Sequence, residues 1–135
     1  MTSILIIDDE AEVGRALTRV LERAGFLVTA VTGGAEGIAE FERNPAEVVI
    51  TDIIMPKING VEAIDFIRRE FPSVRIIAIS GGGNFGISAY QPNAITTSAY
   101  LAAAERAGAH MILTKPFESR ELIQAVEQVL GVGHA

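Results

Sequence analysis

The sequence contains no cysteine and no tryptophan, and it has no long apolar run. Without cysteine the chain has no disulfide framework and no thiolate chemistry. Its apolar runs are only as long as a strand, so none is expected to span a bilayer. The N-terminus also lacks the basic region and the longer apolar run of a signal peptide. A cytoplasmic protein with no membrane partner is therefore expected.

Basic residues are also scarce, with 11 Lys and Arg against 17 Asp and Glu and a net charge of −6. Non-specific nucleic-acid binding requires a basic surface, so we expect no direct nucleic-acid partner. The 135 residues suffice for one domain, and a hydrophobic fraction of 49% excludes general disorder. We predict a single domain over residues 1–135, with its core between residues 3 and 130.

Short apolar runs alternate five times with amphipathic segments. Continuous apolar runs of this length are typical of strands that are buried on both faces of a parallel sheet. The predicted strands are Ser3–Ile7, Phe26–Val31, Glu47–Thr51, Val74–Ile79 and His110–Leu113. The predicted helices are Ala11–Ala24, Ala35–Arg43, Val61–Phe71, Ser98–Ala107 and Glu118–Leu130. The alternation predicts an α/β fold with helices on both faces of the sheet.

Polar side chains stand where four of the predicted strands end. Asp8 and Asp9 follow the first strand, Asp52 the third, Ser80 the fourth, and Lys115 comes shortly after the fifth. Each has an ordinary structural alternative: a helix cap for the first two, a turn or loop residue for Asp52 and Ser80, and a solvated amine for Lys115. Because ligands bind at the carboxyl ends of strands in open parallel sheets, we favour a common site.

The residue types at this edge indicate a particular chemistry. Three crowded carboxylates repel one another unless one is protonated or a cation lies between them. Oxygen ligands suit Mg²⁺, and the absence of histidine and cysteine from the cluster disfavours zinc. An aspartate can act as a nucleophile and carry an acyl phosphate, while an ammonium group and a hydroxyl neutralise the transferred group. The sequence therefore predicts that Asp52 accepts a phosphoryl group with Mg²⁺ as cofactor.

The same residues carry a family resemblance. The elements are the Asp8-Asp9 pair, DIIMPKING at residues 52–60, Ser80, and Lys115-Pro116-Phe117. Together they resemble a response-regulator receiver domain of two-component signalling, of the single-domain chemotaxis type, from Ser3 to Leu130. The resemblance implies a doubly wound, flavodoxin-like (βα)5 fold with a five-stranded parallel sheet in the order 2-1-3-4-5.

The resemblance also implies roles for individual residues. Asp52 corresponds to the phosphoacceptor, and Asp9, Asp52 and the backbone carbonyl of Ile54 to the metal ligands. Asp8 corresponds to the acid that acts on the metal through water.

Further positions follow from the same resemblance. Ser80 and Lys115 correspond to the residues that contact the phosphoryl group, and the bond before Pro116 to the family's cis peptide.

The sequence departs from the family pattern at two places. Ile112 stands where these domains usually carry an aromatic switch residue, so rotation of a ring cannot be the readout there. Residues 81–98 lengthen the region between the fourth strand and fourth helix by roughly a dozen residues, more than an ordinary loop excess. This insert is either a tolerated surface elaboration or a lid or docking loop for a partner. Ile54 and Gly82 offer no group that would position an attacking water, so slow self-dephosphorylation is expected.

These observations predict a phosphorylation-dependent signalling switch and not an enzyme beyond its own phosphorylation and dephosphorylation. The donor would be a sensor histidine kinase or a histidine phosphotransfer protein. The output would be a changed surface of the fourth helix, the fifth strand and the fifth helix, which a downstream protein recognises.

Two alternatives stay open. A Mg²⁺-dependent phosphohydrolase of the haloacid-dehalogenase type would need an Asp-x-Asp pair after the first strand, whereas the acids here are adjacent. A degenerate receiver that binds partners without phosphorylation is kept open by Ile112.

Overall fold

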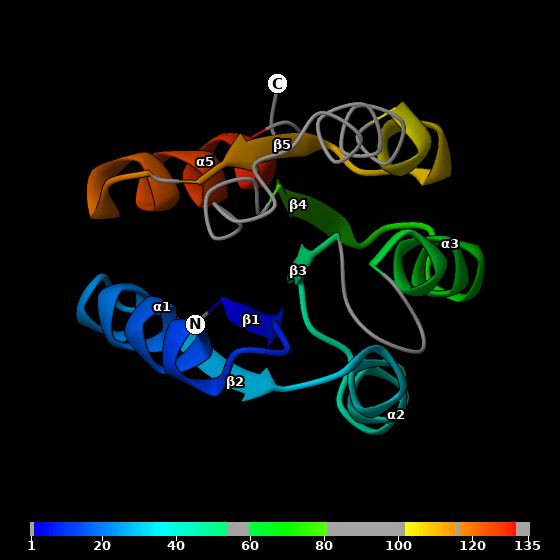
Figure 1. The fold of residues 1–135 in the computed structure, drawn as a ribbon, viewed down its shortest axis with the longest axis horizontal. Helices are drawn as coiled ribbons and strands as arrows, with labels where there is room; N and C mark the ends of the chain where they lie inside the picture. Colours follow the sequence, from blue (N-terminus) through cyan, green and yellow to red (C-terminus); the bar gives the residue numbers. More distant parts are fainter. Residues whose placement is uncertain (1, 54–59, 81–101, 116, 132–135) are drawn as a thin grey trace, which may run out of the picture.

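The computed structural model describes residues 2–53, 60–80, 102–115 and 117–131. Five parallel strands form one sheet in the order β2-β1-β3-β4-β5 (Figure 1). The strands are β1 (Ser3–Ile7), β2 (Leu27–Val31), β3 (Val48–Asp52), β4 (Arg75–Ser80) and β5 (Met111–Thr114). The helices are α1 (Ala11–Arg23), α2 (Gly34–Arg43), α3 (Gly60–Glu70) and α5 (Ser119–Gly131), and residues 102–107 are also helical. The predicted fold class and strand order are confirmed.

The helices cover both faces of the sheet, with α1 and α5 on one side and α2 and α3 on the other (Figure 1). The α1/α5 face is filled by side chains such as Ile4, Leu21, Ile50, Ile77 and Val126. The α2/α3 face is filled by Leu5, Phe41, Val49, Ile64 and Ala78, with Ala104 from the helical residues 102–107. Alternate residues of each strand thus supply the two cores, which explains why the strands read as continuous apolar runs.

Strands β3 and β4 each begin and end one residue later than the sequence pattern predicts. Asp52 pairs with Ile79, and Ser80 pairs with Thr114. Ladder pairing at the strand ends therefore carries both polar residues into the sheet. As a result, Asp52 and Ser80 are held as the last residues of strands and not in the loops that follow.

Two glycines occupy positions where a side chain would be strained or would clash. Gly25 has φ +99° and ends α1, which is a backbone conformation that residues with a side chain rarely adopt. At Gly37 in α2, an added Cβ would lie 2.4 Å from Cδ1 of Ile7, so α2 rests directly on β1. This close packing of α2 holds β1, the strand that leads to Asp8, in place.

No helix in the described ranges is long and apolar enough to cross a membrane.

Candidate functional site

The three predicted acids meet at the carboxyl edge of the sheet. Ile7 pairs with Thr51, so the residues that follow these two, Asp8 and Asp52, leave adjacent strands side by side. One carboxylate oxygen from each of Asp8, Asp9 and Asp52 lies within 4.8 Å of the others. Asp8 and Asp52 are buried, with 1% and 5% of their surfaces exposed, while Asp9 is exposed.

The carboxylate of Asp8 has only part of its bonding capacity filled. Its Oδ1 accepts a hydrogen bond from the Glu10 N–H at 2.9 Å. Its Oδ2 lies 3.8 Å from Nζ of Lys115, which is too long for a hydrogen bond. Both of these buried atoms are without a hydrogen-bond partner among the residues that the structure describes.

The pKa of Asp8 is set by its burial and by its two neighbours, the Glu10 N–H and Lys115. Burial raises the pKa of Asp8, against the opposing effects of the Glu10 backbone hydrogen bond and the Lys115 charge. A buried acid with an open oxygen beside two further carboxylates is suited to receive a cation. The residues present therefore fit a Mg²⁺ ion, which Asp8, Asp9 and Asp52 would hold.

The helix-capping alternative for the two adjacent acids is wrong. The N-cap residue of α1 is Glu10, and its side chain makes no capping hydrogen bond. Asp8 instead accepts the N–H of that cap residue from outside the helix. The pair is therefore not explained by the start of α1.

Lys115 reaches the acids because β5 pairs with β4. The Lys115 N–H donates to the Ser80 carbonyl at 3.1 Å, which continues the ladder past the end of β5. The Lys115 side chain is only 14% exposed, so the solvated-amine alternative is wrong. Ser80 is 3% exposed and belongs to β4, so the loop alternative is wrong as well.

Ser80 and Asp52 lie on opposite faces of the sheet. Along β4, Ile77 and Ile79 pack on the α1/α5 face, whereas Ile76 and Ala78 pack on the α2/α3 face. Strand alternation therefore places Ser80 on the α2/α3 side. The same rule places Asp52 on the α1/α5 side, with Val48 and Ile50. The two residues share an edge but start from opposite faces of the sheet.

Ile112 lies in β5, pairs with Ala78 and packs partly buried against the α2/α3 core. Ile54, Gly82, Pro116 and the insert at residues 81–98 lie outside the described residues. Sequence reasoning passed over Thr51, which is fully buried beside Asp52. The only signal for it was a hydroxyl in an otherwise apolar run.

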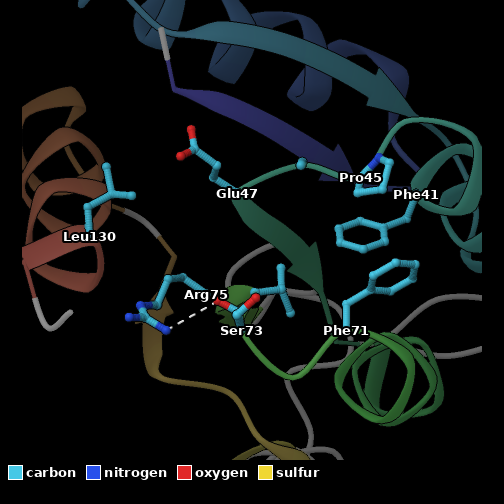
Figure 2. A pocket seen from close by; sticks show the side chains of 9 residues that line it. Phe41, Pro45, Glu47, Phe71, Ser73, Arg75 and Leu130 are labelled. Atoms are coloured by element: carbon cyan, nitrogen blue, oxygen red, sulfur yellow. Dashed lines mark hydrogen bonds between the residues drawn. The ribbon is translucent and has the colours of Figure 1, made fainter.

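A pocket lies at the opposite edge of the sheet (Figure 2). It has a volume of about 460 Å³ and is lined by residues at the amino ends of β3 and β4 and the ends of α2, α3 and α5. Phe41 and Phe71 meet there edge to face, with ring centroids 4.7 Å apart. Arg75 donates to the Ser73 carbonyl, as Figure 2 shows, and to the Val129 carbonyl. None of the predicted site residues lines this pocket, so it is not the site.

Comparison with known proteins decides the family. The model of the response regulator receiver domain matches residues 4–127. The chain belongs to this family. Receiver domains of two-component systems are generally signalling switches and not true enzymes, and they generally bind Mg²⁺ at an acidic pocket. The resemblance deduced from the sequence is therefore confirmed.

Individual relatives agree with this assignment. The response regulator receiver protein CpdR of Brucella abortus is 28% identical, over 96% of this chain and 98% of its own length. The sensory transduction protein RegX3 of Mycobacterium tuberculosis is 32% identical over 98% of this chain, which spans only 52% of that protein. A crystal structure of a receiver domain protein from Clostridium thermocellum superposes with a TM-score of 0.79 at 29% identity, over 99% of this chain and 98% of its own.

Proposed function

We propose that this receiver domain is a phosphorylation switch that accepts a phosphoryl group on Asp52. The donor would be a histidine kinase or a histidine phosphotransfer protein, and Mg²⁺ would be required. The observation that carries the proposal is the acidic cluster itself, in which three carboxylates lie within 4.8 Å and a buried ammonium group stands 3.8 Å from Asp8. No purely structural role explains this arrangement, because crowded buried charges cost stability.

The reaction follows from the roles of the side chains. A carboxylate oxygen of Asp52 attacks the phosphorus of a donor phosphohistidine, an O–P bond forms, and the P–N bond to the histidine breaks. The electron pair of that bond stays on the imidazole, which takes up a proton. When Mg²⁺ is bound, it neutralises charge on the phosphoryl oxygens.

The residues around Asp52 serve the same step. Asp8 and Asp9 would hold the ion beside Asp52, and the ammonium group of Lys115 would pair with the new negative charge. Ser80 would approach the phosphoryl group from the α2/α3 side of the sheet. That movement would couple the site to β5 and the helices next to it, where a downstream protein would bind.

Ile112 bears on how the change is read out. An isoleucine cannot change exposure by rotating a ring about χ1 as an aromatic side chain does. We therefore assign the readout to displacement of the backbone around β5 and its neighbouring helices. The cytoplasm is the proposed location, and the donor and target proteins would be found there.

Intact-protein mass spectrometry after incubation with acetyl phosphate tests the proposal. Wild type should gain one phosphoryl group with Mg²⁺ and none with a chelator present, and Asp52→Asn should gain none. Failure of the wild type to gain mass in any condition would contradict the switch and favour partner binding without phosphorylation. Turnover of a small phosphate ester in excess over protein, tested in a separate assay, would favour the phosphohydrolase.

A further inference from the structure

Thr51 is a buried polar residue for which the proposed chemistry has no role so far. Among the described residues, the buried polar or charged side chains are Asp8, Thr51, Asp52 and Ser80. The other three belong to the site, whereas the Thr51 side chain shares the α2/α3 face with Val49, one strand repeat before it. Its neighbours on the adjacent strands are Ile7 and Ala78, both apolar.

A valine would suit this position better if packing alone mattered. The two side chains have nearly the same shape, but burying a hydroxyl is unfavourable unless it forms a hydrogen bond. The Thr51 hydroxyl forms that bond with the chain itself, donating to the backbone carbonyl of Asp52 at 2.9 Å. The bond is therefore the feature that distinguishes threonine from valine here.

The peptide group after Asp52 is held from both of its polar ends. Its carbonyl oxygen accepts from the Thr51 hydroxyl, and its N–H, which belongs to Ile53, donates to the Ile79 carbonyl at 3.1 Å. Ile53 is itself buried in the α2/α3 core. One side chain and one neighbouring strand thus fix the orientation of the peptide plane at the end of β3.

We propose that Thr51 is a positioning residue for the phosphoacceptor, because it holds the Asp52–Ile53 peptide so that the Asp52 carboxylate faces the other acids. This inference rests on the proposed function. The Asp52 side chain leaves the backbone at the Cα that adjoins this peptide, so a rotated peptide displaces the carboxylate. Small displacements of a reacting group are costly to rate, because productive geometry is narrow.

Three variants separate positioning from packing. Thr51→Val keeps the shape and removes the hydroxyl, whereas Thr51→Ser keeps the hydroxyl and removes a methyl group. Val49→Ala is a matched control on the same strand and the same face, and it removes packing without touching the hydrogen bond. The melting temperature and the initial rate of phosphorylation by acetyl phosphate at saturating Mg²⁺ are measured for each.

The positioning role predicts opposite orders for the two readouts. Thr51→Val should melt near the wild-type temperature but phosphorylate about fivefold more slowly, the factor that corresponds to one lost hydrogen bond. Thr51→Ser should keep most of the rate despite a lower melting temperature. Val49→Ala should lose melting temperature and keep the rate. In Thr51→Val, hydrogen exchange of the Ile53 amide should also be faster than in wild type.

The outcomes distinguish this inference from the proposed function. A wild-type rate in Thr51→Val, or a slow rate in Thr51→Ser, would overturn the positioning role while leaving the switch intact. Rates that follow melting temperature across all three variants would reduce Thr51 to a packing residue and overturn the inference. Absence of phosphorylation in the wild type would overturn both proposals.

Discussion

At the amino edge of the sheet Arg75 donates to the Val129 and Ser73 carbonyls, whereas at the carboxyl edge Lys115 stands 3.8 Å from Asp8 without a hydrogen bond. Among the described residues, Lys115 Nζ and Asp8 Oδ2 are the buried side-chain polar atoms left unpaired, and both lie at the carboxyl edge. At the amino edge the Arg75 guanidinium is paired, and Phe41 and Phe71 pack edge to face. The two edges of the sheet therefore differ in role. The amino edge, with its paired groups, contributes to stability, whereas the carboxyl edge keeps unpaired charged groups for chemistry.

The largest expected effect comes from removing the nucleophile at the carboxyl edge. Asp52→Asn should lower phosphorylation by acetyl phosphate by more than about a hundredfold, because the amide is not a competent nucleophile. Its free energy of unfolding, measured in urea, should stay equal to wild type or rise, since one of three crowded acids is gone. A strongly destabilised Asp52→Asn would show that the acids hold the fold together, contrary to the comparison of the edges.

The reverse pattern is expected at the amino edge. Phe41 is 1% exposed and packs on Phe71, so Phe41→Ala should lower the free energy of unfolding by about 3–5 kcal/mol. The phosphorylation rate per folded molecule should stay within about twofold of wild type, measured at a temperature well below the transition. Phe41→Leu serves as the milder control. A selective loss of rate in both variants would mean that the two edges are coupled.

A smaller effect of opposite sign is expected at Asp8. Because its Oδ2 is buried without a hydrogen bond in the part of the chain that the structure describes, Asp8→Asn should raise the free energy of unfolding at pH 7 by about 1 kcal/mol. Added Mg²⁺ should stabilise the wild type, by about 2.7 kcal/mol at a hundredfold excess over its dissociation constant, and stabilise the variant less.

The matched control for this experiment is Asp65→Asn, an exposed acid on α3 that pairs with Arg69. It should leave both the stability and the Mg²⁺ effect nearly unchanged. Equal Mg²⁺ stabilisation of wild type and Asp8→Asn would count against a cation held by the acidic cluster.

The smallest expected effect is a pH dependence at the amino edge. The Ile76 N–H donates to Nδ1 of His110 at 3.1 Å, so this imidazole acts as an acceptor in the β4–β5 ladder. Burial lowers the pKa of His110 below its ordinary value of 6.5, and the Arg68 and Arg75 charges lower it further. Because the unfolded chain then binds the proton more tightly, stability is complete above pH 6.5 and falls as the pH drops toward the folded-state pKa.

The loss should approach about 1 kcal/mol, the worth of one hydrogen bond, and urea unfolding between pH 5 and 8 measures it. His110→Asn offers a comparable acceptor that does not titrate, so it should flatten the pH profile over this range. If wild type and His110→Asn show the same profile, the imidazole is not the group that titrates.

The sequence predicted the fold well because its apolar runs and amphipathic segments each match one element. The errors in the described elements were single residues at the ends of strands and helices. Propensity argues that Asp52 and Ser80 leave their strands, but pairing with Ile79 and Thr114 keeps both in the sheet. The edge at which the acids meet was also predictable, since parallel topology alone brings Asp8 and Asp52 together.

Other features depend on three-dimensional contacts that no sequence pattern encodes. That Asp8 has one filled and one open oxygen follows from the Glu10 N–H and from the reach of Lys115. Ser80 lies on the opposite face of the sheet from Asp52. This follows from which residue of β4 is its last, because successive side chains of a strand alternate between the two faces. The hydrogen bond from the Thr51 hydroxyl to the carbonyl of Asp52 depends on the side-chain rotamer of Thr51. A threonine within a run of β-branched residues does not predict it.

Locating the phosphoryl group shows whether Asp52 is the phosphoacceptor. An acyl phosphate is reduced by borohydride to the alcohol, so the modified aspartate becomes homoserine, which peptide mass spectrometry identifies after digestion. We expect homoserine at position 52 after incubation with acetyl phosphate and Mg²⁺, and none when Mg²⁺ is chelated. Homoserine at position 8 or 9, or phosphorylated protein with no reducible aspartate, would contradict this expectation.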